Sequence, residues 1–325
     1  MFLRFARSTQ PVTLILLTLM VGIMWFTVPI KNDYCNAPAI SICSWISRLA
    51  DNTSLPARLT GMASLLLMAS LIININTKFL FIGQRTYLPG MLFLLLALML
   101  HQTQSFHPIF WAGLLLLFAL DRLLGTHRYE GLANQVFDAA LLTGLAAVFY
   151  PPLFFLLPFF FFALLILRPF NWREWFLVIT GMAIPFYLTY AWIYLFDKPE
   201  SNHFISGYIH LITFPCPGLK PSATESIVLY YVIFIVLISF FYLLRIMGNI
   251  KIFTRKSYYL FMILALNLLL IYWLIPQAGK EIFILLAIPV SYLLALYFLS
   301  GRQTRLRLIF FDALVISAIL IRYIN

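Results

Sequence analysis

The sequence predicts an all-α protein, a polytopic bundle of about eleven transmembrane helices that forms one integral membrane domain over residues 1–325. Of the 325 residues, 63% are hydrophobic and only 10% are charged, whereas about 25% of the residues of a soluble domain are charged. The mean hydropathy of +0.95 excludes a disordered chain. The apolar residues also form long runs separated by few polar residues, as membrane-spanning helices require.

The stretch from Asn134 to Phe186 shows this pattern most clearly. Two apolar runs, 134–150 and 152–167, meet at Tyr150-Pro151-Pro152, and a short charged turn at 168–174 leads into a third run. At 1.5 Å per residue, each of the first two runs covers only ~25 Å, which is short for a full crossing. They therefore either cross the membrane or form a re-entrant hairpin, and in both cases the chain returns to the side that it left.

The first apolar run, at about 12–30, follows a short basic leader that contains Arg4 and Arg7. A signal peptide is the alternative, but the run is long and no small-residue cleavage site follows it. We therefore expect an uncleaved first helix with a cytoplasmic N-terminus. Further apolar runs follow at 58–76, 87–104, 108–124, 134–150, 152–167, 175–196, 226–245, 258–275, 281–299 and 307–324.

The positive charges support this topology. The net charge is +11, but no basic run is interleaved with a polar recognition surface, so we expect no nucleic-acid partner. Basic residues lie instead at the ends of apolar runs. With a cytoplasmic N-terminus, 15 of the 22 Lys and Arg residues fall on the inner side and 7 on the outer side. This is the asymmetry that the positive-inside rule requires, and it predicts a cytoplasmic N-terminus.

Two loops stand out by their length, and both are predicted to lie outside: residues 31–57 and residues 197–225. The first has the pattern of a short amphipathic helix on the membrane surface. Long loops in a compact membrane protein are where functional residues concentrate. Three cysteines fall in these loops, and either two of them form a disulfide or all stay reduced: Cys35, Cys43 and Cys216.

Three acidic residues are candidates for chemistry. Asp33 and Asp51 lie in the first outer loop, where a carboxylate could act as a general base; ordinary solvated surface charges are the simpler interpretation. Asp138 lies in an apolar run, and an acid there marks a functional candidate. Because it is near the cytoplasmic end and within reach of Arg122, Arg128 or Arg168, a structural ion pair is favoured. No metal-ligand spacing is present, so no metal site is predicted.

The turn at Arg168 to Trp175 is predicted to anchor the chain at the interface. Trp172 and Trp175 flank the charged residues Arg173 and Glu174, and tryptophan side chains concentrate at headgroup depth.

This turn, followed by Gly181 and Pro185, resembles an uncharacterised family of multi-pass inner-membrane proteins from Bacteroidota, for which no activity is implied. The arrangement of helices and outer loops is also similar to that of membrane glycosyltransferases of the GT-C type. That resemblance implies a polyprenyl-phosphate-linked sugar as the lipid substrate and Asp33 as the catalytic base or a metal ligand, with Asp51 in reserve. The outer cations would hold the lipid phosphate: Arg58, Lys198, Lys220 and Lys280. The chain departs from those enzymes because it has no paired-acid motif, and its second outer loop, 101–108, has no acid.

Two functions therefore remain open. The first is the sugar transferase just described. The second is a transporter or a non-enzymatic assembly partner, in which polar residues of the apolar runs line a pathway or a helix contact. Neither a P-loop nor a dinucleotide motif is present, and the sequence identifies no cofactor and no protein partner. The polar residues in question are Asn74, Asn76, Asn134, Asp138 and Asn267.

Overall fold

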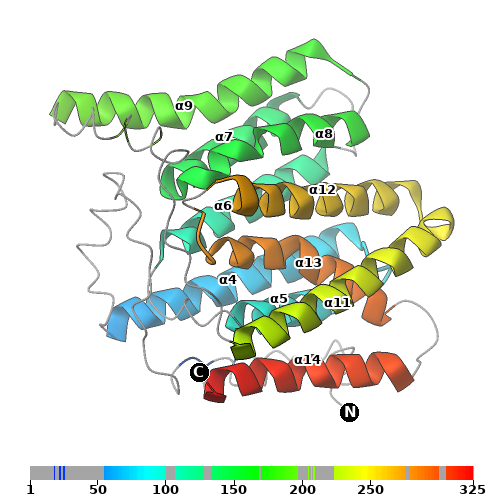
Figure 1. Ribbon diagram of the computed structural model, residues 1–325. Helices are drawn as coiled ribbons and strands as arrows, with labels where there is room; N and C mark the ends of the chain where they lie inside the picture. The colour runs from blue at the N-terminus through cyan, green and yellow to red at the C-terminus, as the bar shows by residue number, and fades with distance from the viewer. Residues whose placement is uncertain are drawn as a thin grey trace.

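The computed structural model describes residues 55–99, 107–126, 133–167, 170–196, 223–275, 278–299 and 305–324, together with Thr18, Gly22, Trp25, Phe204, Ser206 and Tyr208. All of the regular secondary structure in this part of the chain is helical, with ten α-helices and two short 3-10 helices (Figure 1). The elements are α4 (Leu55–Phe79), α5 (Leu88–Leu98), α6 (Pro108–Gly125), α7 (Ala133–Phe149), η2 (Pro151–Leu156), α8 (Leu157–Leu167), α9 (Trp172–Phe196), α11 (Ala223–Ile246), η3 (Met247–Asn249), α12 (Ile252–Leu274), α13 (Ile282–Leu299) and α14 (Arg305–Ile324).

Each of the ten apolar runs predicted after the first one is a helix in the structure. Most of the run at 12–30 lies outside the described residues, although Thr18, Gly22 and Trp25 are helical. Five of the described helices are long and apolar enough to cross a membrane. These candidate spans are Arg58–Phe79, Pro108–Gly125, Trp172–Leu195, Ile252–Leu274 and Ile282–Leu299.

Helix α5 is shorter than the predicted run at 87–104, because it ends at Leu98. The prediction extended into His101-Gln102-Thr103-Gln104, which are polar and do not continue the apolar pattern. At 1.5 Å per residue, eleven residues cover only about 16 Å. Almost every residue of α5 is buried, so its surroundings are other helices rather than lipid.

Helix α9 begins earlier than predicted, at Trp172 rather than Trp175. Asn171 explains this start, because its Oδ1 accepts a hydrogen bond from the backbone N–H of Arg173 at 3.1 Å. Its carbonyl also accepts from the N–H of Glu174 at 3.1 Å. Asparagine is among the best residues for capping a helix N-terminus. The second half of the predicted turn is therefore the first turn of a helix.

The helices differ greatly in how much of their surface other helices cover. In the most apolar stretch of α13, 89% of the residues are buried by other parts of the protein, whereas in the corresponding stretch of α9 only 28% are buried. In Figure 1, α13 lies between α4, α5, α11 and α12, and α9 lies along one edge of the bundle. Large side chains of α9 are correspondingly exposed, including Tyr187 and Leu195, as suits a helix that faces lipid.

Small residues allow α7 and α9 to pack closely. A Cβ on Gly144 would lie 2.6 Å from the carbonyl oxygen of Met182, and one on Gly181 would lie 2.9 Å from the Cβ of Ala140. Membrane helices without a hydrophobic driving force gain stability from such close backbone approach. Gly181, which follows the charged turn in the sequence, therefore has a packing role.

The helices alternate in direction, so the bundle has two ends. The Lys78 end contains the C-terminal ends of α4, α6 and α8 and the N-terminal ends of α9 and α12, and it lies on the right in Figure 1. The His107 end contains the N-terminal ends of α4, α6 and α13 and the C-terminal end of α7. Contacts between segments support this grouping, such as the hydrogen bond from Lys256 Nζ to the carbonyl of Leu167 at 3.1 Å.

Candidate functional site

Three side chains that can exchange protons or hydrogen bonds lie at the His107 end: His107 before α6, Tyr150 after α7 and Glu281 before α13. The electrostatic influence of Glu281 reaches both His107 and Tyr150. We call these three residues the outer-end cluster, after the side of the membrane on which the sequence predicts this end to lie. They come from parts of the chain that are far apart in the sequence, so only the packing of α6, α7 and α13 brings them together.

His107 caps the N-terminus of α6. Its Nδ1 accepts a hydrogen bond from the backbone N–H of Ile109 at 3.2 Å, so in the neutral ring the proton is on Nε2. Burial lowers the pKa of His107 below its ordinary value, and the Glu281 carboxylate offsets part of this shift. The imidazole is therefore neutral at pH 7, and the helix dipole, which is positive at this end, disfavours its protonation further.

Tyr150 is fixed between α7 and η2. Its N–H donates to the carbonyl of Ala146 at 2.9 Å, and its own carbonyl accepts from Leu153 at 3.0 Å. Only 7% of the residue is exposed. Its hydroxyl nevertheless has no hydrogen-bond partner among the described residues. A buried hydroxyl without a partner is costly, so this group is expected to bond to a residue outside the described part of the chain, to a water molecule or to a ligand.

Glu281 is a buried acid, with 6% of the residue exposed. It directly precedes α13, whose first turn is closed by the hydrogen bond from Ile284 N–H to the Glu281 carbonyl at 2.9 Å. A Cβ on Gly279 would collide with the Glu281 carboxylate, so that carboxylate folds back over Gly279. Lys280, predicted to bind the lipid phosphate, is adjacent in sequence and partly buried.

Together these groups combine a hydrogen-bond acceptor with donors. The Glu281 carboxylate only accepts, whereas the Tyr150 hydroxyl can both donate and accept. Such a set can bind a hydroxyl-bearing ligand or accept a proton from it. No group of three or more His, Cys, Asp or Glu side chains within the described residues is arranged to hold a metal ion.

Arg58, also predicted to bind the lipid phosphate, contacts the first apolar run. Its Nη2 donates to the carbonyl of Trp25 at 3.0 Å, and Trp25 Nε1 donates to the carbonyl of Arg58 at 3.1 Å. Trp25 is fully buried. This reciprocal pair ties the first apolar run to the start of α4, so Arg58 has a structural contact whether or not it also binds an anion.

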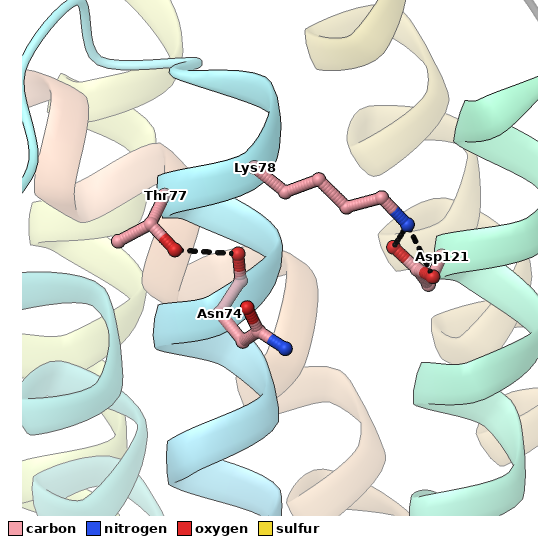
Figure 2. Close-up of polar contacts among 4 residues, drawn as sticks. All are labelled: Asn74, Thr77, Lys78 and Asp121. Carbon is pink, nitrogen blue, oxygen red and sulfur yellow. Dashed lines mark hydrogen bonds and ion pairs between the residues drawn. The ribbon is translucent and has the colours of Figure 1, made fainter.

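At the opposite end, an ion pair joins α4 to α6. Lys78 Nζ lies 2.7 Å from each carboxylate oxygen of Asp121, and Figure 2 shows the Lys78 side chain reaching across to Asp121. On the same helix, the Thr77 hydroxyl donates to the carbonyl of Asn74 at 2.8 Å. The two charged side chains are 46% and 26% exposed, so the pair is accessible rather than deeply buried.

Asn76 lies one turn before the C-terminal end of α4 and is fully buried. Its amide nitrogen is 3.4 Å from the carbonyl oxygen of Thr86, whereas its Oδ1 has no partner within the described part of the chain. Asn267 in α12 likewise has an unpartnered Oδ1 there. These two residues were predicted to line a pathway or a helix contact.

The predicted anchor at the start of α9 is built from aromatic contacts. Trp172 is 68% exposed and packs against Phe170 with ring centroids 5.2 Å apart. Trp175 stacks on Phe161 at 4.6 Å. Arg173 is exposed, whereas Glu174 is buried. An exposed tryptophan on an aromatic platform at the end of a membrane helix is typical of interfacial anchoring.

Other predicted residues are less constrained by the structure. Asp138 is exposed, and it forms no ion pair with Arg122; pairing with Arg128 or Arg168 stays a prediction because both lie outside the described residues. Four further predicted site residues and the three cysteines also lie outside the described residues: Asp33, Asp51, Lys198, Lys220, Cys35, Cys43 and Cys216.

The sequence interpretation did not select Glu281, Tyr150 or Asp121 as site residues. Glu281 had a detectable signal, since Lys280-Glu281 is a charged pair between two apolar runs. Tyr150 had none, because a tyrosine before Pro151-Pro152 is indistinguishable from other aromatic residues in this chain. Asp121 pairs with a residue 43 positions away, which no local pattern reveals.

A family described as "Family of unknown function (DUF6427)" matches residues 41–324. The chain belongs to this family. The matched region contains the outer-end cluster, Arg58, Asp51 and every described helix from α4 to α14, whereas Asp33 precedes it. No curated protein and no solved structure matches the sequence. Membership in DUF6427 agrees with the expected uncharacterised family and assigns no activity, so function has to be argued from the geometry.

Proposed function

We propose that this DUF6427 chain is a bacterial inner-membrane protein of about eleven helices that transfers a sugar from a polyprenyl-phosphate carrier at the outer leaflet. The outer-end cluster is the observation that carries the proposal. A buried carboxylate, that of Glu281, and a buried hydroxyl without a partner among the described residues, that of Tyr150, lie at one end of a membrane bundle, and Lys280 precedes Glu281 in the sequence. Buried polar groups at such a position usually have a ligand, a partner or a proton to handle.

The orientation follows from the charges at the two ends. Basic residues at the Lys78 end include Arg122, Arg245, Lys251 and Arg255, whereas the described basic residues of the His107 end are Arg58, Lys280 and Arg322. The positive-inside rule assigns the basic end to the cytoplasm. This supports a cytoplasmic N-terminus and an outward-facing His107 end.

In the proposed reaction, an acceptor hydroxyl attacks the anomeric carbon of the lipid-linked sugar. The bond from that carbon to the phosphate oxygen breaks, and polyprenyl phosphate leaves with the bonding electrons. A carboxylate accepts the proton of the attacking hydroxyl. Asp33 is the proposed acceptor of that proton, with Asp51 in reserve. The leaving phosphate would be held by the outer cations, among them Lys280 and Arg58, because a dianionic group requires positive charge nearby.

The test is a comparison of lipid-linked and surface glycans, by mass spectrometry, in cells with the wild-type gene, without the gene, and with Asp33→Asn or Asp51→Asn. We expect a polyprenyl-phosphate sugar to accumulate in the deletion strain and in at least one of the two variants. Unchanged glycans and unchanged lipid-linked precursors in the deletion strain would contradict the transferase.

The second candidate, a transporter, is favoured by the buried Asn76 and Asn267, whose side-chain oxygens have no partner within the described residues. Polar groups that are unsatisfied inside a membrane bundle mark a possible pathway. A transporter would also change glycan precursors, but purified protein in vesicles would then move the lipid-linked sugar between leaflets without forming a product. A non-enzymatic assembly partner would do neither.

A further inference from the structure

A row of large apolar side chains covers one face of α11. Each member is at least 45% exposed, although residues of this kind are usually buried. The members recur at the spacing of one helix face, so they form a continuous strip. A large exposed apolar strip marks a surface that contacts lipid or a partner. We call it the α11 apolar row, and it consists of Ile233, Phe234, Leu237, Phe241 and Leu244.

The α11 apolar row ends at a basic residue. Arg245 directly follows Leu244, is exposed, and forms no ion pair within the described part of the chain. At about 3.6 residues per turn, Arg245 lies between the face of Phe241, which is exposed, and the face of Tyr242. A long basic side chain at the end of an apolar helix lays its stem on the apolar surface and places its charge at headgroup depth.

Tyr242 joins α11 to a second cation. The guanidinium carbon of Arg307, in the first turn of α14, lies 4.6 Å from the ring centroid of Tyr242 and 5.0 Å from that of Tyr297 in α13. The two rings contact each other edge to face, with centroids 5.4 Å apart. A guanidinium packed against aromatic faces keeps its N–H donors around its edge. Arg307 is therefore held in place between α11, α13 and α14.

Hydrogen bonds fix these three helices relative to one another. Ser239 Oγ donates to the carbonyl of Leu293 at 2.7 Å, and the Tyr231 hydroxyl donates to the carbonyl of Phe310 at 2.8 Å. Figure 1 shows the C-terminal ends of α11 and α13 and the N-terminal end of α14 at the same end of the bundle. The acid of α14, Asp312, lies about 7 Å further along the helix axis than Arg307. The two arginines therefore lie at the basic end of the row.

We propose that this surface binds an anionic phospholipid, with the headgroup phosphate at Arg245 and Arg307 and the acyl chains along the α11 apolar row. Arginine presents a planar set of donors that suits a phosphate, and basic pockets between membrane helices bind anionic headgroups. The row favours a lipid over a free phosphate, because only the lipid has apolar surface to bury there. Such a surface is independent of sugar transfer and compatible with both candidate functions.

The experiment measures lipid binding to the purified, delipidated full-length chain in detergent, by native mass spectrometry. The two probes are dioleoyl phosphatidylglycerol, which is anionic, and dioleoyl phosphatidylcholine, which has the same acyl chains and no net charge. We expect the wild type to bind phosphatidylglycerol more tightly. Arg245→Gln should lower that preference about fivefold, as expected for one basic residue beside an anionic lipid. Arg245→Lys keeps the charge and should keep most of the preference.

Arg173→Gln is the matched control. Arg173 is also an exposed arginine at the Lys78 end, but it belongs to α9, which packs mainly against α7 and α8. This variant should prefer phosphatidylglycerol as strongly as the wild type does. Arg307→Gln removes the second cation, and its preference should fall as well. Thermal unfolding shows whether each variant is folded.

Four results would overturn the assignment. A wild type without a preference for phosphatidylglycerol excludes an anionic lipid. Equal losses in Arg173→Gln and Arg245→Gln show that the preference follows the total charge of this end. Displacement of phosphatidylglycerol by the same concentration of glycerol 3-phosphate shows that the surface binds a soluble phosphate. A dimer that forms in place of the lipid complex shows that the α11 apolar row contacts a second copy of the chain.

Discussion

At the Lys78 end, charged side chains are numerous and most are partly exposed, whereas at the His107 end the described charges are few; each end also has one buried acid, Glu174 and Glu281 respectively. Lys78 pairs with Asp121, and the Arg307 guanidinium lies 4.6 Å from the ring centroid of Tyr242. Glu281 has no such counter-charge among the described residues. The two ends are formed by the same helices, so the difference in how their charged side chains are paired reflects how the helices pack as well as which residues they contain.

The comparison teaches which charges a membrane bundle needs for its own structure. Exposed basic residues at one end are satisfied by headgroups, aromatic rings and acidic side chains such as Asp121, and they fix orientation. The buried Glu281 carboxylate, which forms no ion pair within the described part of the chain, contributes nothing of this kind. Replacing a buried charge by an uncharged group of similar shape is often neutral or stabilising. Its presence therefore argues for a role beyond folding.

The prediction with the largest expected effect is that the two ends of the bundle lie on opposite sides of the membrane. Cysteine labelling tests it with an all-or-none result. In a background with Ser at positions 35, 43 and 216, a cysteine replacing Lys251 should not react with an impermeant thiol reagent in intact cells. A cysteine replacing Lys220, in the predicted outer loop, should react. Permeabilised cells serve as the control, where both should react. Labelling of position 251 in intact cells would overturn the orientation.

Acid sensitivity at the His107 end comes next. The pKa of His107 is lowered by burial, so the unfolded chain binds a proton more readily than the folded chain. The stability that neutral His107 contributes is therefore fully present above pH 6.5, the ordinary pKa of a histidine side chain. This contribution is lost as the pH falls below that value toward the pKa of the folded state. The loss is at most about 1.4 kcal/mol per pH unit.

Thermal unfolding of the purified protein between pH 7.5 and pH 5.5 measures this loss. His107→Asn is the matched variant, because asparagine caps a helix N-terminus well and does not titrate. The variant should lose less stability on acidification than the wild type. Equal losses in both proteins would show that His107 is not the sensitive group.

The sequence predicted the helices well and the site poorly, for a physical reason. A run such as 108–124 needs only local information, because a membrane helix satisfies its own backbone hydrogen bonds, and α6 was found there. The start of α9 was missed by three residues because a single side chain, Asn171, decides it. The predicted extent of α5 was wrong because polar residues after Leu98 were counted as part of the run.

The outer-end cluster depends on tertiary packing and had no comparable local signal. His107, Tyr150 and Glu281 lie at the ends of three different helices, and their burial is a property of the assembled bundle. Lys280 was selected from its position in an outer loop, which also marked the neighbourhood of Glu281. The burial that makes Glu281 unusual could not be inferred from that position.

A double-mutant cycle on the Lys78–Asp121 pair tests the opposite end. Because both side chains are partly exposed, we expect a coupling energy below about 1 kcal/mol that weakens with added salt. Lys78→Met, Asp121→Asn and the double variant would be compared by thermal unfolding in detergent. A salt-independent coupling of several kcal/mol would show that the pair is desolvated, and the contrast between the two ends would then disappear.

The smallest expected effect concerns the turn after Lys78, where Leu80 adopts a positive φ of 52°. Its N–H donates to the carbonyl of Asn76 at 2.8 Å, which is the helix-ending bond that usually has glycine at this position. The left-handed conformation costs a residue with a side chain about 1 kcal/mol, and glycine avoids that cost but loses more entropy on folding. We therefore expect Leu80→Gly to raise stability by no more than about 0.5 kcal/mol.

Gly83 is the internal control, because its φ is 79° and a Cβ there would meet nothing within 4 Å. Gly83→Ala should lower stability through backbone strain alone. If Leu80→Gly instead destabilises the protein in detergent, side-chain contacts of Leu80 outweigh the strain, and this turn is held by packing rather than by backbone geometry.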